Sequence, residues 1–351
     1  MVNTVIQEDI AGIVNESGLP WDRFRNSTVL ISGGNGFLAA YLVRTLMYLN
    51  GMNFNIQMIL LVRSEARARA VYPEFAFGDK IRFLVQDVCE PVHTDAKIDY
   101  IIHAASNASP KYFGLDPVGT LSANVIGTNN LLALAREKKV KSFLFISSGE
   151  VYGEVDKSKI PTKETDYGYI DLENVRTCYQ ESKRMGEAMC VSWHHQYGVP
   201  AVIVRPFHTY GPGMRLDDGR VFADFVSNIV HNQDIVMKSD GSAVRAFCYI
   251  ADAAAGFFTV LLHGEKGQAY NIGNDNGRIT ILDLAKVLTG LYPEKHLHII
   301  EDTSSQVQGY LQSSISENCP DISKARALGW APQTGIEQGF RRTVESFYNN
   351  N

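Results

Sequence analysis

Residues 28–40 read TVLISGGNGFLAA, and this stretch decides the fold of the chain. The apolar run 28–32 has the length of a buried strand, and helical sequence follows to about Leu49. Between them, Gly33, Gly36 and Ala39 have the spacing of a turn that approaches a pyrophosphate closely, which a Cβ would block. The helix that begins there offers N–H donors and the positive end of its dipole to an anion. The sequence therefore predicts a dinucleotide-binding turn.

The same rhythm of strand and helix continues well beyond this turn. Further strands are predicted at 56–62, 81–85, 100–103, 143–146 and 201–204, with a long helix at 118–138. Continuous apolar strands that alternate with helices indicate a parallel sheet covered on both faces. We predict a doubly wound α/β (Rossmann) domain formed by residues 1–205 and about 232–265. A smaller, partly interleaved α/β substrate domain is predicted at 206–231 and 266–351.

Composition excludes several classes of function. The chain is 45% hydrophobic and 20% charged, and its formal charge of −5 offers no basic surface for a nucleic acid. No apolar run approaches the roughly 20 residues of a membrane span, and the acidic N-terminal stretch lacks the basic start of a signal peptide. That stretch instead has apolar residues at helical spacing and predicts an amphipathic helix. The five cysteines are widely spaced without a metal-binding pattern, so we expect a cytoplasmic protein with no metal site.

The end of the second strand indicates which dinucleotide binds. NAD sites usually place a carboxylate there for the ribose 2′-hydroxyl, but this chain reads Val62-Arg63-Ser64. A guanidinium suits a 2′-phosphate by charge and by geometry. The sequence favours NADP, with NAD as the alternative and a solvated surface arginine as the simpler interpretation of Arg63.

Residues 177–183, TCYQESK, predict the start of a helix that carries reactive side chains. Thr177 and Gln180 fit a capping box. Tyr179 and Lys183 are four residues apart and project from one face of the helix. A tyrosine normally keeps its proton to about pH 10, and a neighbouring ammonium favours the phenolate. Tyr179 is therefore a candidate base for a sugar or alcohol hydroxyl.

The strand predicted at 143–146 ends in the sequence SSGEVYG, residues 147–153. It places the Ser148 hydroxyl and the Glu150 carboxylate at the edge of the sheet where the glycine turn also lies. With the glycine turn and the Tyr179–Lys183 pair, this exit is typical of a site that moves protons.

At this point the chain resembles, from about residue 28 to 343, the extended short-chain dehydrogenase/reductase family, whose members modify nucleotide sugars. The resemblance rests on the glycine turn, Ser148 and the Tyr179–Lys183 pair. It implies a tightly bound cofactor, a nucleotide-sugar substrate and a homodimer. The cofactor contacts that it implies are Gly33, Asn35, Gly36, Phe37, Leu38, Arg63, Asp87, Val88, Ala104, Ala105, Ser106, Tyr179, Lys183, Pro206 and His208.

Within that family, five segments are most similar to UDP-glucuronate decarboxylases: 103–112, 176–179, 208–212, 218–221 and 241–247. The similarity implies that Arg245 reaches the diphosphate or the sugar carboxylate, with a structural ion pair as the simpler alternative. His208 packs either beside the nicotinamide or in the core. Residues 215–225 are expected to line the nucleotide pocket. The implied substrate contacts are Ser148, Gly149, Glu150, Arg176, Tyr179, His208, Arg215, Val221, Phe222 and Arg245.

The resemblance also implies a reaction that begins with oxidation at sugar carbon 4. Tyr179 takes the hydroxyl proton while hydride passes to the cofactor, and Ser148 hydrogen-bonds the same oxygen. The resulting ketone permits decarboxylation, dehydration or epimerisation, with Glu150 as a base at carbon 5. Two positions depart from the pattern of the decarboxylases. Gly149 stands where relatives carry an acid or hydroxyl, and Arg63 stands where the decarboxylases carry an acidic residue.

A UDP-glucuronate decarboxylase-like enzyme is the first hypothesis for the reaction. A 4,6-dehydratase or epimerase of the same family is its alternative. A catalytically silent NADP-binding sensor or scaffold is the hypothesis from another class.

Overall fold

The computed structural model describes residues 3–75, 77–302 and 315–348. Its centre is a parallel sheet with the strand order β11-β6-β5-β4-β1-β2-β3. The order reverses beside β1, so the glycine turn after β1 lies at the switch point where such sheets bind ligands. Its strands are β1 (Thr28–Ser32), β2 (Gln57–Val62), β3 (Ile81–Val85), β4 (Tyr100–His103), β5 (Ser142–Ile146), β6 (Ala201–Pro206) and β11 (Ala269–Ile272). The predicted doubly wound fold is confirmed.

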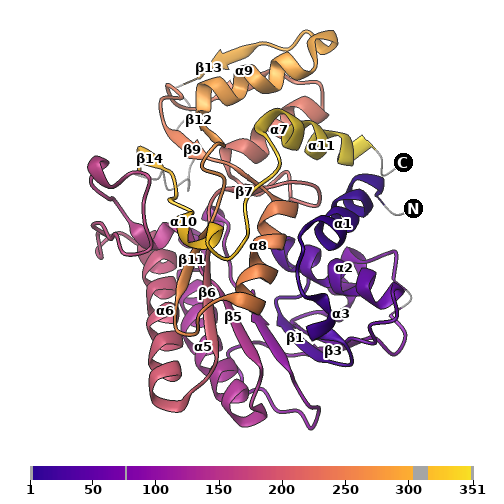
Figure 1. Cartoon of the computed structure of the whole chain (residues 1–351). Helices are drawn as coiled ribbons and strands as arrows, with labels where there is room; N and C mark the ends of the chain where they lie inside the picture. Colours follow the sequence, from indigo (N-terminus) through magenta and orange to yellow (C-terminus); the bar gives the residue numbers. More distant parts are fainter. Residues whose placement is uncertain (1–2, 76, 303–314, 349–351) are drawn as a thin grey trace.

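Helices cover both faces of this sheet (Figure 1). The pair α5 and α6 covers one face, and α2 and α8 cover the other. Every strand residue of β4 and β5 is buried, as expected for strands enclosed on two sides. The longer helices are α1 (Thr4–Glu16), α2 (Phe37–Gly51), α5 (Pro117–Lys138), α6 (Thr177–Tyr197), α7 (Val221–Val230), α8 (Ile250–His263), α9 (Ile281–Leu291) and α11 (Ile336–Tyr348). The shorter ones are α3 (Glu65–Val71), α4 (Pro110–Leu115) and α10 (Ser323–Arg326).

Within the described ranges, three small sheets lie above the carboxyl ends of the strands. They consist of β12-β9-β14, β13-β8 and β10-β7. Their strands are β7 (Thr209–Tyr210), β8 (Ile235–Met237), β9 (Val244–Ala246), β10 (Cys248–Tyr249), β12 (Arg278–Thr280), β13 (Ile299–Glu301) and β14 (Glu317–Asn318). These elements and the large sheet enclose the candidate site from opposite sides.

The predicted domain ranges differ from this arrangement at two places. β8 and β9 fall in the range 232–265 assigned to the Rossmann domain, but they pair with strands of the small sheets. β11 falls in the range 266–351 assigned to the second domain, but it pairs with β6 in the large sheet. Two- to four-residue strands are too short to show a period that would assign them. Residues 303–314 and 349–351 of the predicted second domain lie outside the described residues.

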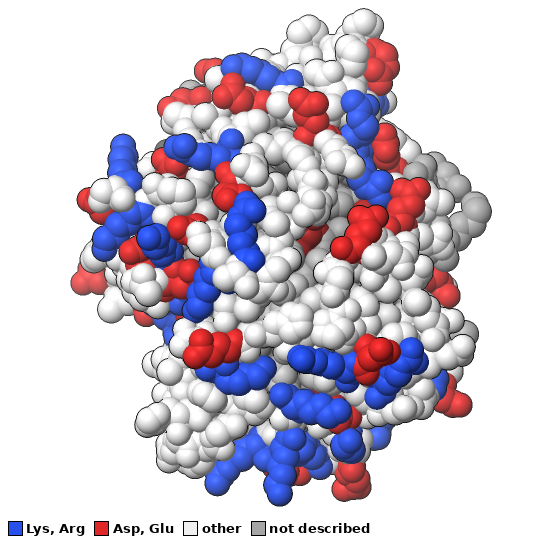
Figure 2. Space-filling model, viewed as in Figure 1, with Lys and Arg blue, Asp and Glu red and all other residues white. Residues whose placement is uncertain are grey.

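The predicted N-terminal helix is confirmed as α1, which packs against α2, α8 and the C-terminal α11 (Figure 1). Asp9 is buried there and accepts hydrogen bonds from Tyr41, Tyr249 and Arg342. The network joins both ends of the chain to the body of the protein. In the part of the chain that the structure describes, no helix has the length and apolarity to cross a bilayer. Acidic and basic side chains are mixed over the face in Figure 2, although Lys and Arg gather at its lower end.

Candidate active site

A pocket of about 300 Å³ opens between the carboxyl ends of the central strands and the small sheets. It receives residues from the glycine turn, from the exit of β5, from α6 and from the segments after β6. Of the predicted site residues, sixteen line it: Gly36, Phe37, Leu38, Ala104, Ser106, Ser148, Gly149, Glu150, Arg176, Tyr179, Lys183, Pro206, His208, Val221, Phe222 and Arg245. The fold thus brings together segments that lie more than 200 residues apart in the sequence.

The glycine turn has the shape that a dinucleotide requires. Gly33 has φ of +63°, and a Cβ on it would lie 2.7 Å from the Cα of Ala105. The turn closes when the Gly36 N–H donates to the carbonyl of Gly33 at 2.8 Å. Gly36 then caps α2 without a side chain, so the first turn of the helix faces an open surface. These residues fit a pyrophosphate at the N-terminus of α2.

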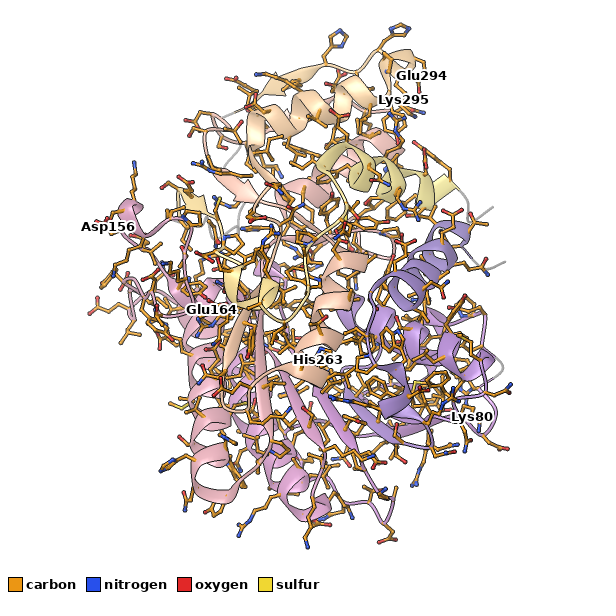
Figure 3. The ribbon with its side chains drawn as sticks, viewed as in Figure 1. Lys80, Asp156, Glu164, His263, Glu294 and Lys295 are labelled. Atoms are coloured by element: carbon orange, nitrogen blue, oxygen red, sulfur yellow. The ribbon has the colours of Figure 1, made fainter. Side chains whose placement is uncertain are left out.

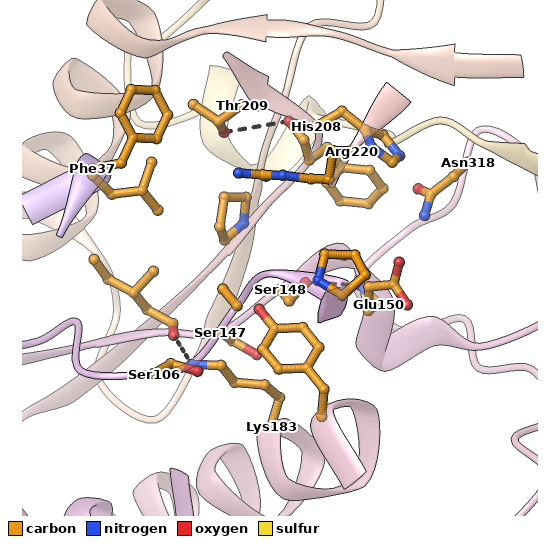
Figure 4. Close-up of a pocket in the computed structure, with 18 of the residues that line it drawn as sticks. Phe37, Ser106, Ser147, Ser148, Glu150, Lys183, His208, Thr209, Arg220 and Asn318 are labelled. Carbon is orange, nitrogen blue, oxygen red and sulfur yellow. Dashed lines mark hydrogen bonds between the residues drawn. The ribbon is translucent and has the colours of Figure 1, made fainter. Parts of the chain in front are cut away.

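Tyr179 and Lys183 of α6 line the pocket beside the exit of β5, and Figure 4 shows Lys183 below Ser147. The Lys183 Nζ donates to the carbonyl of Ile146 at 2.7 Å and lies 5.8 Å from the Tyr179 ring centre. The Tyr179 ring stacks on Phe113 with centroids 4.8 Å apart and an interplanar angle of 17°. Both reactive side chains are therefore fixed by packing and by the strand.

The pKa values of the pair differ from the sequence-based expectation. Burial raises the pKa of Tyr179 to about 12, which the Ser148 hydroxyl and the Arg220 charge oppose and the Glu150 charge reinforces. Burial lowers the pKa of Lys183 to about 7, against the charge of Glu187. The expected lowering of the phenol pKa by the ammonium is not seen, because burial is the largest influence on the pKa of both groups.

Glu150 lies at the side of the pocket, in the 3₁₀ turn that follows β5. Its Oε2 accepts from the Gln180 amide at 3.2 Å and from the Arg176 guanidinium at 3.4 Å. Its backbone N–H donates to Ser148 Oγ at 3.1 Å. The predicted capping box is therefore wrong. The side chain of Gln180 is hydrogen-bonded to Glu150 instead. Thr177 is the first residue of α6, and its hydroxyl donates to the carbonyl of Asn174.

Gly149, the departure from relatives, is packed against an aromatic ring. A Cβ at this position would meet three ring carbons of Phe207 at 3.0–3.1 Å. Phe207 is 1% exposed and contacts Val151 and Tyr152. The ring would therefore have to shift by a few tenths of an ångström to admit a side chain at 149.

The opposite wall of the pocket carries His208 and Arg220 (Figure 4), and Arg245 also lines the pocket. Burial and the two guanidinium charges hold the pKa of His208 well below its usual range, so the imidazole is neutral. Its Nε2 is buried and has no hydrogen-bond partner among the described residues. Arg245 donates to the carbonyls of Val244, Ser316 and Ile315. This wall therefore offers two guanidinium groups and the imidazole Nε2 of His208 to a ligand in the pocket.

Seven predicted residues lie outside this pocket. Arg215 lines a neighbouring hollow with Lys111 and Asp217, and the others follow the first strands: Gly33, Asn35, Arg63, Asp87, Val88 and Ala105. Sequence reasoning missed the contribution of Phe113 and Asn318 and did not single out Arg220 within the predicted range 215–225. Of these three, only Arg220 could have been identified from the sequence, because it lies in the segment 218–221 that is similar to the decarboxylases.

Comparison with known proteins supports the resemblance. The sequence pattern of the "NAD dependent epimerase/dehydratase family" matches residues 29–273. UDP-glucuronic acid decarboxylase 6 of Arabidopsis thaliana is 32% identical over 92% of this chain and 89% of its own length. UDP-glucuronic acid decarboxylase 1 of Danio rerio is 31% identical over 91% and 72%, respectively.

Solved structures show the same fold. UDP-glucose 4-epimerase of Thermotoga maritima aligns with a TM-score of 0.78 at 23% identity, covering 92% of this chain and 98% of that one. UDP-glucuronic acid 4-epimerase of Bacillus cereus, in complex with UDP-glucuronic acid and NAD, aligns with a TM-score of 0.76 at 22% identity, covering 92% and 100%. From the family match and the decarboxylase relatives together, the chain is an enzyme of the NAD dependent epimerase/dehydratase family.

Proposed function

We propose that the enzyme modifies a nucleotide-diphosphate sugar through oxidation at carbon 4, and that its reaction is the decarboxylation of UDP-glucuronate. The observation that carries this proposal is the meeting of Ser148, Glu150, Tyr179 and Lys183 in one pocket beside the glycine turn. The proposal is supported by the plant and fish relatives, which are named for this reaction and align with almost the whole chain.

The residues that hold the cofactor would be those of the glycine turn and of the loop 104–106, with Lys183 at the nicotinamide ribose. The cofactor supplies the hydride acceptor at carbon 4 and returns the hydride at the end of the reaction. Arg63 supports NADP: it is exposed after β2, and the nearest following carboxylate, Glu65, pairs with Arg69 at 2.6 Å. The Bacillus cereus structure holds NAD, so cofactor preference is a direct test of this assignment.

Tyr179 takes the proton of the sugar 4-hydroxyl, and Ser148 hydrogen-bonds the same oxygen as it becomes a ketone. Without substrate, burial raises the pKa of Tyr179 and keeps the phenol protonated, and the positive charge of Arg220 opposes this rise and favours the phenolate that the step needs. The 4-ketone lies β to the carboxylate on carbon 5. Carbon dioxide can then leave with the bonding electron pair delocalised into the ketone, and carbon 5 takes up a proton.

The surroundings of Glu150 bear on whether the second step is decarboxylation or dehydration. Loss of water needs an acid beside the leaving hydroxyl. The resemblance implies an acid at the position of Gly149 in dehydratases and a hydroxyl there in decarboxylases, and this chain has neither. The Phe207 ring packs against that position here. Arg176 and Arg245 line the pocket and can receive a sugar carboxylate.

The test is incubation with UDP-glucuronate and a panel of UDP-, dTDP-, GDP- and CDP-sugars, each with NADP or NAD, followed by mass spectrometry and NMR. Loss of carbon dioxide supports the proposal. Loss of water or an isomer of unchanged mass assigns a dehydratase or an epimerase instead. Cofactor binding without turnover of any sugar favours a silent sensor or scaffold.

Two further predictions concern the protein as a whole. Apolar side chains are exposed on the paired helices α5 and α6, among them Val118 at 70% and Met185 at 51%. We propose that a second copy covers them in a homodimer, which light scattering of the purified protein would detect as twice the chain mass. The cytoplasmic location stays a prediction.

A further inference from the structure

Behind the catalytic pair lies a buried carboxylate that the proposed reaction does not use. Glu187 follows Lys183 by one helical turn on α6 and is 8% exposed. Its Oε1 accepts from the Ser147 hydroxyl at 2.5 Å and from Arg205 Nε at 2.9 Å. Its Oε2 accepts from a second nitrogen of Arg205 at 2.5 Å. The carboxylate is thus tied to the residue next to Ser148 and to β6.

Arg205 extends the same network to the other side of the site. It is 2% exposed, and it donates to the Tyr152 hydroxyl, to the carbonyl of Glu164 and to the Tyr167 hydroxyl at 2.8–3.1 Å. Glu164, labelled in Figure 3, also accepts from the backbone of Asn271 at 2.8 Å. A single guanidinium therefore joins α6 to the segment that leads into Arg176.

A buried ion pair of this kind is weak support for stability alone. Removing two charges from water costs several kcal/mol per ion, and apolar replacements of such pairs are often neutral. The placement of Glu187 offers a second role, because its hydrogen-bond partner adjoins one of the four catalytic candidates and a second candidate lies one turn away on the same helix. Ser147 precedes Ser148, and Lys183 lies one turn back on the same helix.

We propose that Glu187 is a positioning residue of the catalytic site, which holds the Ser147–Ser148 strand exit against α6 and places a carboxylate one helical turn from the Lys183 ammonium. The inference rests on the proposed function, since these two effects matter only if Ser148 and Lys183 serve a reaction. Without the carboxylate, the hydroxyl of Ser147 loses its acceptor and the buried ammonium loses its counter-charge.

The other groups around Lys183 do not provide that counter-charge. On β4, His103 is neutral because burial lowers its pKa to about 3. On α6, burial raises the pKa values of Tyr179 and of the Cys190 thiol, so both are protonated and neutral. From β5, the Ile146 carbonyl contributes a dipole without net charge. Among these neighbours, Glu187 alone carries the negative charge that opposes the depressed pKa of Lys183.

The test is an NMR titration of Lys183 in the full-length protein without substrate, with the lysine ε carbons isotope-labelled and the Lys183 signal identified from its loss in Lys183→Arg. Glu187→Gln should lower the titration midpoint by about one pH unit or more, because the buried ammonium then loses the negative charge that opposes its desolvation. Glu187→Asp, which keeps the charge, should move it by less. Glu181→Gln is the matched control: this carboxylate lies on the same helix, pairs with Arg184 and should leave the midpoint unchanged.

If Glu187→Gln does not fold, the double variant Glu187→Gln/Arg205→Met removes both charges of the pair and serves in its place. It should also lower the midpoint. A Lys183 midpoint that is the same in either variant as in the wild type overturns the proposal. The titration needs no turnover, so a failure of the proposed reaction on every sugar would leave this result standing, and the two failures are distinguishable.

Discussion

The side-chain amide of Gln180 donates to Glu150 Oε2 at 3.2 Å, and this hydrogen bond links the residue after Tyr179 to the exit of β5. This contact therefore fixes the helix that carries Tyr179, the proposed proton acceptor, relative to Glu150, the carboxylate proposed for the second step. Ser148 is also linked to Glu150, because its Oγ accepts a hydrogen bond from the backbone N–H of Glu150. Substitutions at these residues should therefore separate their contributions to the reaction.

Glu150→Gln should separate the two halves of the reaction. Oxidation at carbon 4 depends on Tyr179 and Ser148, so it should continue, whereas proton transfer at carbon 5 should slow by about 10²–10⁴-fold. We expect transient reduced cofactor and a 4-keto sugar to accumulate, measured by nicotinamide absorbance and mass spectrometry. Glu154→Gln removes an exposed carboxylate four residues away and should behave as the wild type. A Glu150 variant with unchanged turnover would assign carbon 5 chemistry to another group.

Lys183→Met should abolish turnover and yet stabilise the protein near neutral pH. The folded pKa of about 7 lies below the ordinary value of 10.5, so the unfolded chain holds more protons between these two values. Wild-type stability should therefore rise with pH across that window, and the buried ammonium is most costly below about pH 7. Thermal unfolding at about pH 6 should show the variant more stable by about 1–3 kcal/mol, with the difference shrinking at about pH 9. A difference that is constant with pH would mean that Lys183 does not titrate in this range.

Gly149→Ser should destabilise the fold, because the new Cβ presses on the Phe207 ring. The expected cost is about 1–3 kcal/mol in the free energy of unfolding. Phe207→Leu should relieve part of it, so a double-mutant cycle in denaturant should show coupling between the two positions. Independent, additive effects on the free energy of unfolding would contradict this. They would show that the Phe207 ring moves aside without an energetic cost and does not explain the glycine at position 149.

The fold follows from local signals in the sequence, and the details of the site do not. Strands such as 28–32 and 100–103 are continuous apolar runs, and both match the structure to the residue. The capping box fails because Gln180 has a tertiary partner, Glu150, which no local pattern shows. The packing of Phe207 on Gly149 and of Phe113 on Tyr179 joins segments that are distant in the chain. Burial then sets the pKa values of Tyr179 and Lys183 against the simple expectation for a neighbouring phenol and ammonium.

Arg63→Ala should weaken the binding of NADP by about tenfold, equal to about 1.4 kcal/mol, and leave the binding of NAD nearly unchanged. The reason is that a 2′-phosphate gains a charged partner that a 2′-hydroxyl does not need. Arg82→Ala, an exposed arginine on β3, is the matched control. Equal losses for both cofactors, or tighter binding of NAD than NADP by the wild type, would contradict the NADP assignment.

The central claim is oxidation at carbon 4 with Tyr179 as the base, and rapid mixing of the cofactor-loaded enzyme with UDP-glucuronate tests it most directly. In the wild type we predict that reduced-nicotinamide absorbance appears within the first turnover and that carbon dioxide is released afterwards. In Tyr179→Phe, which keeps the ring stacked on Phe113 but has no hydroxyl, both signals should be lost. Carbon dioxide release by the wild type without reduced cofactor, or an equal absorbance transient in Tyr179→Phe, would contradict the account.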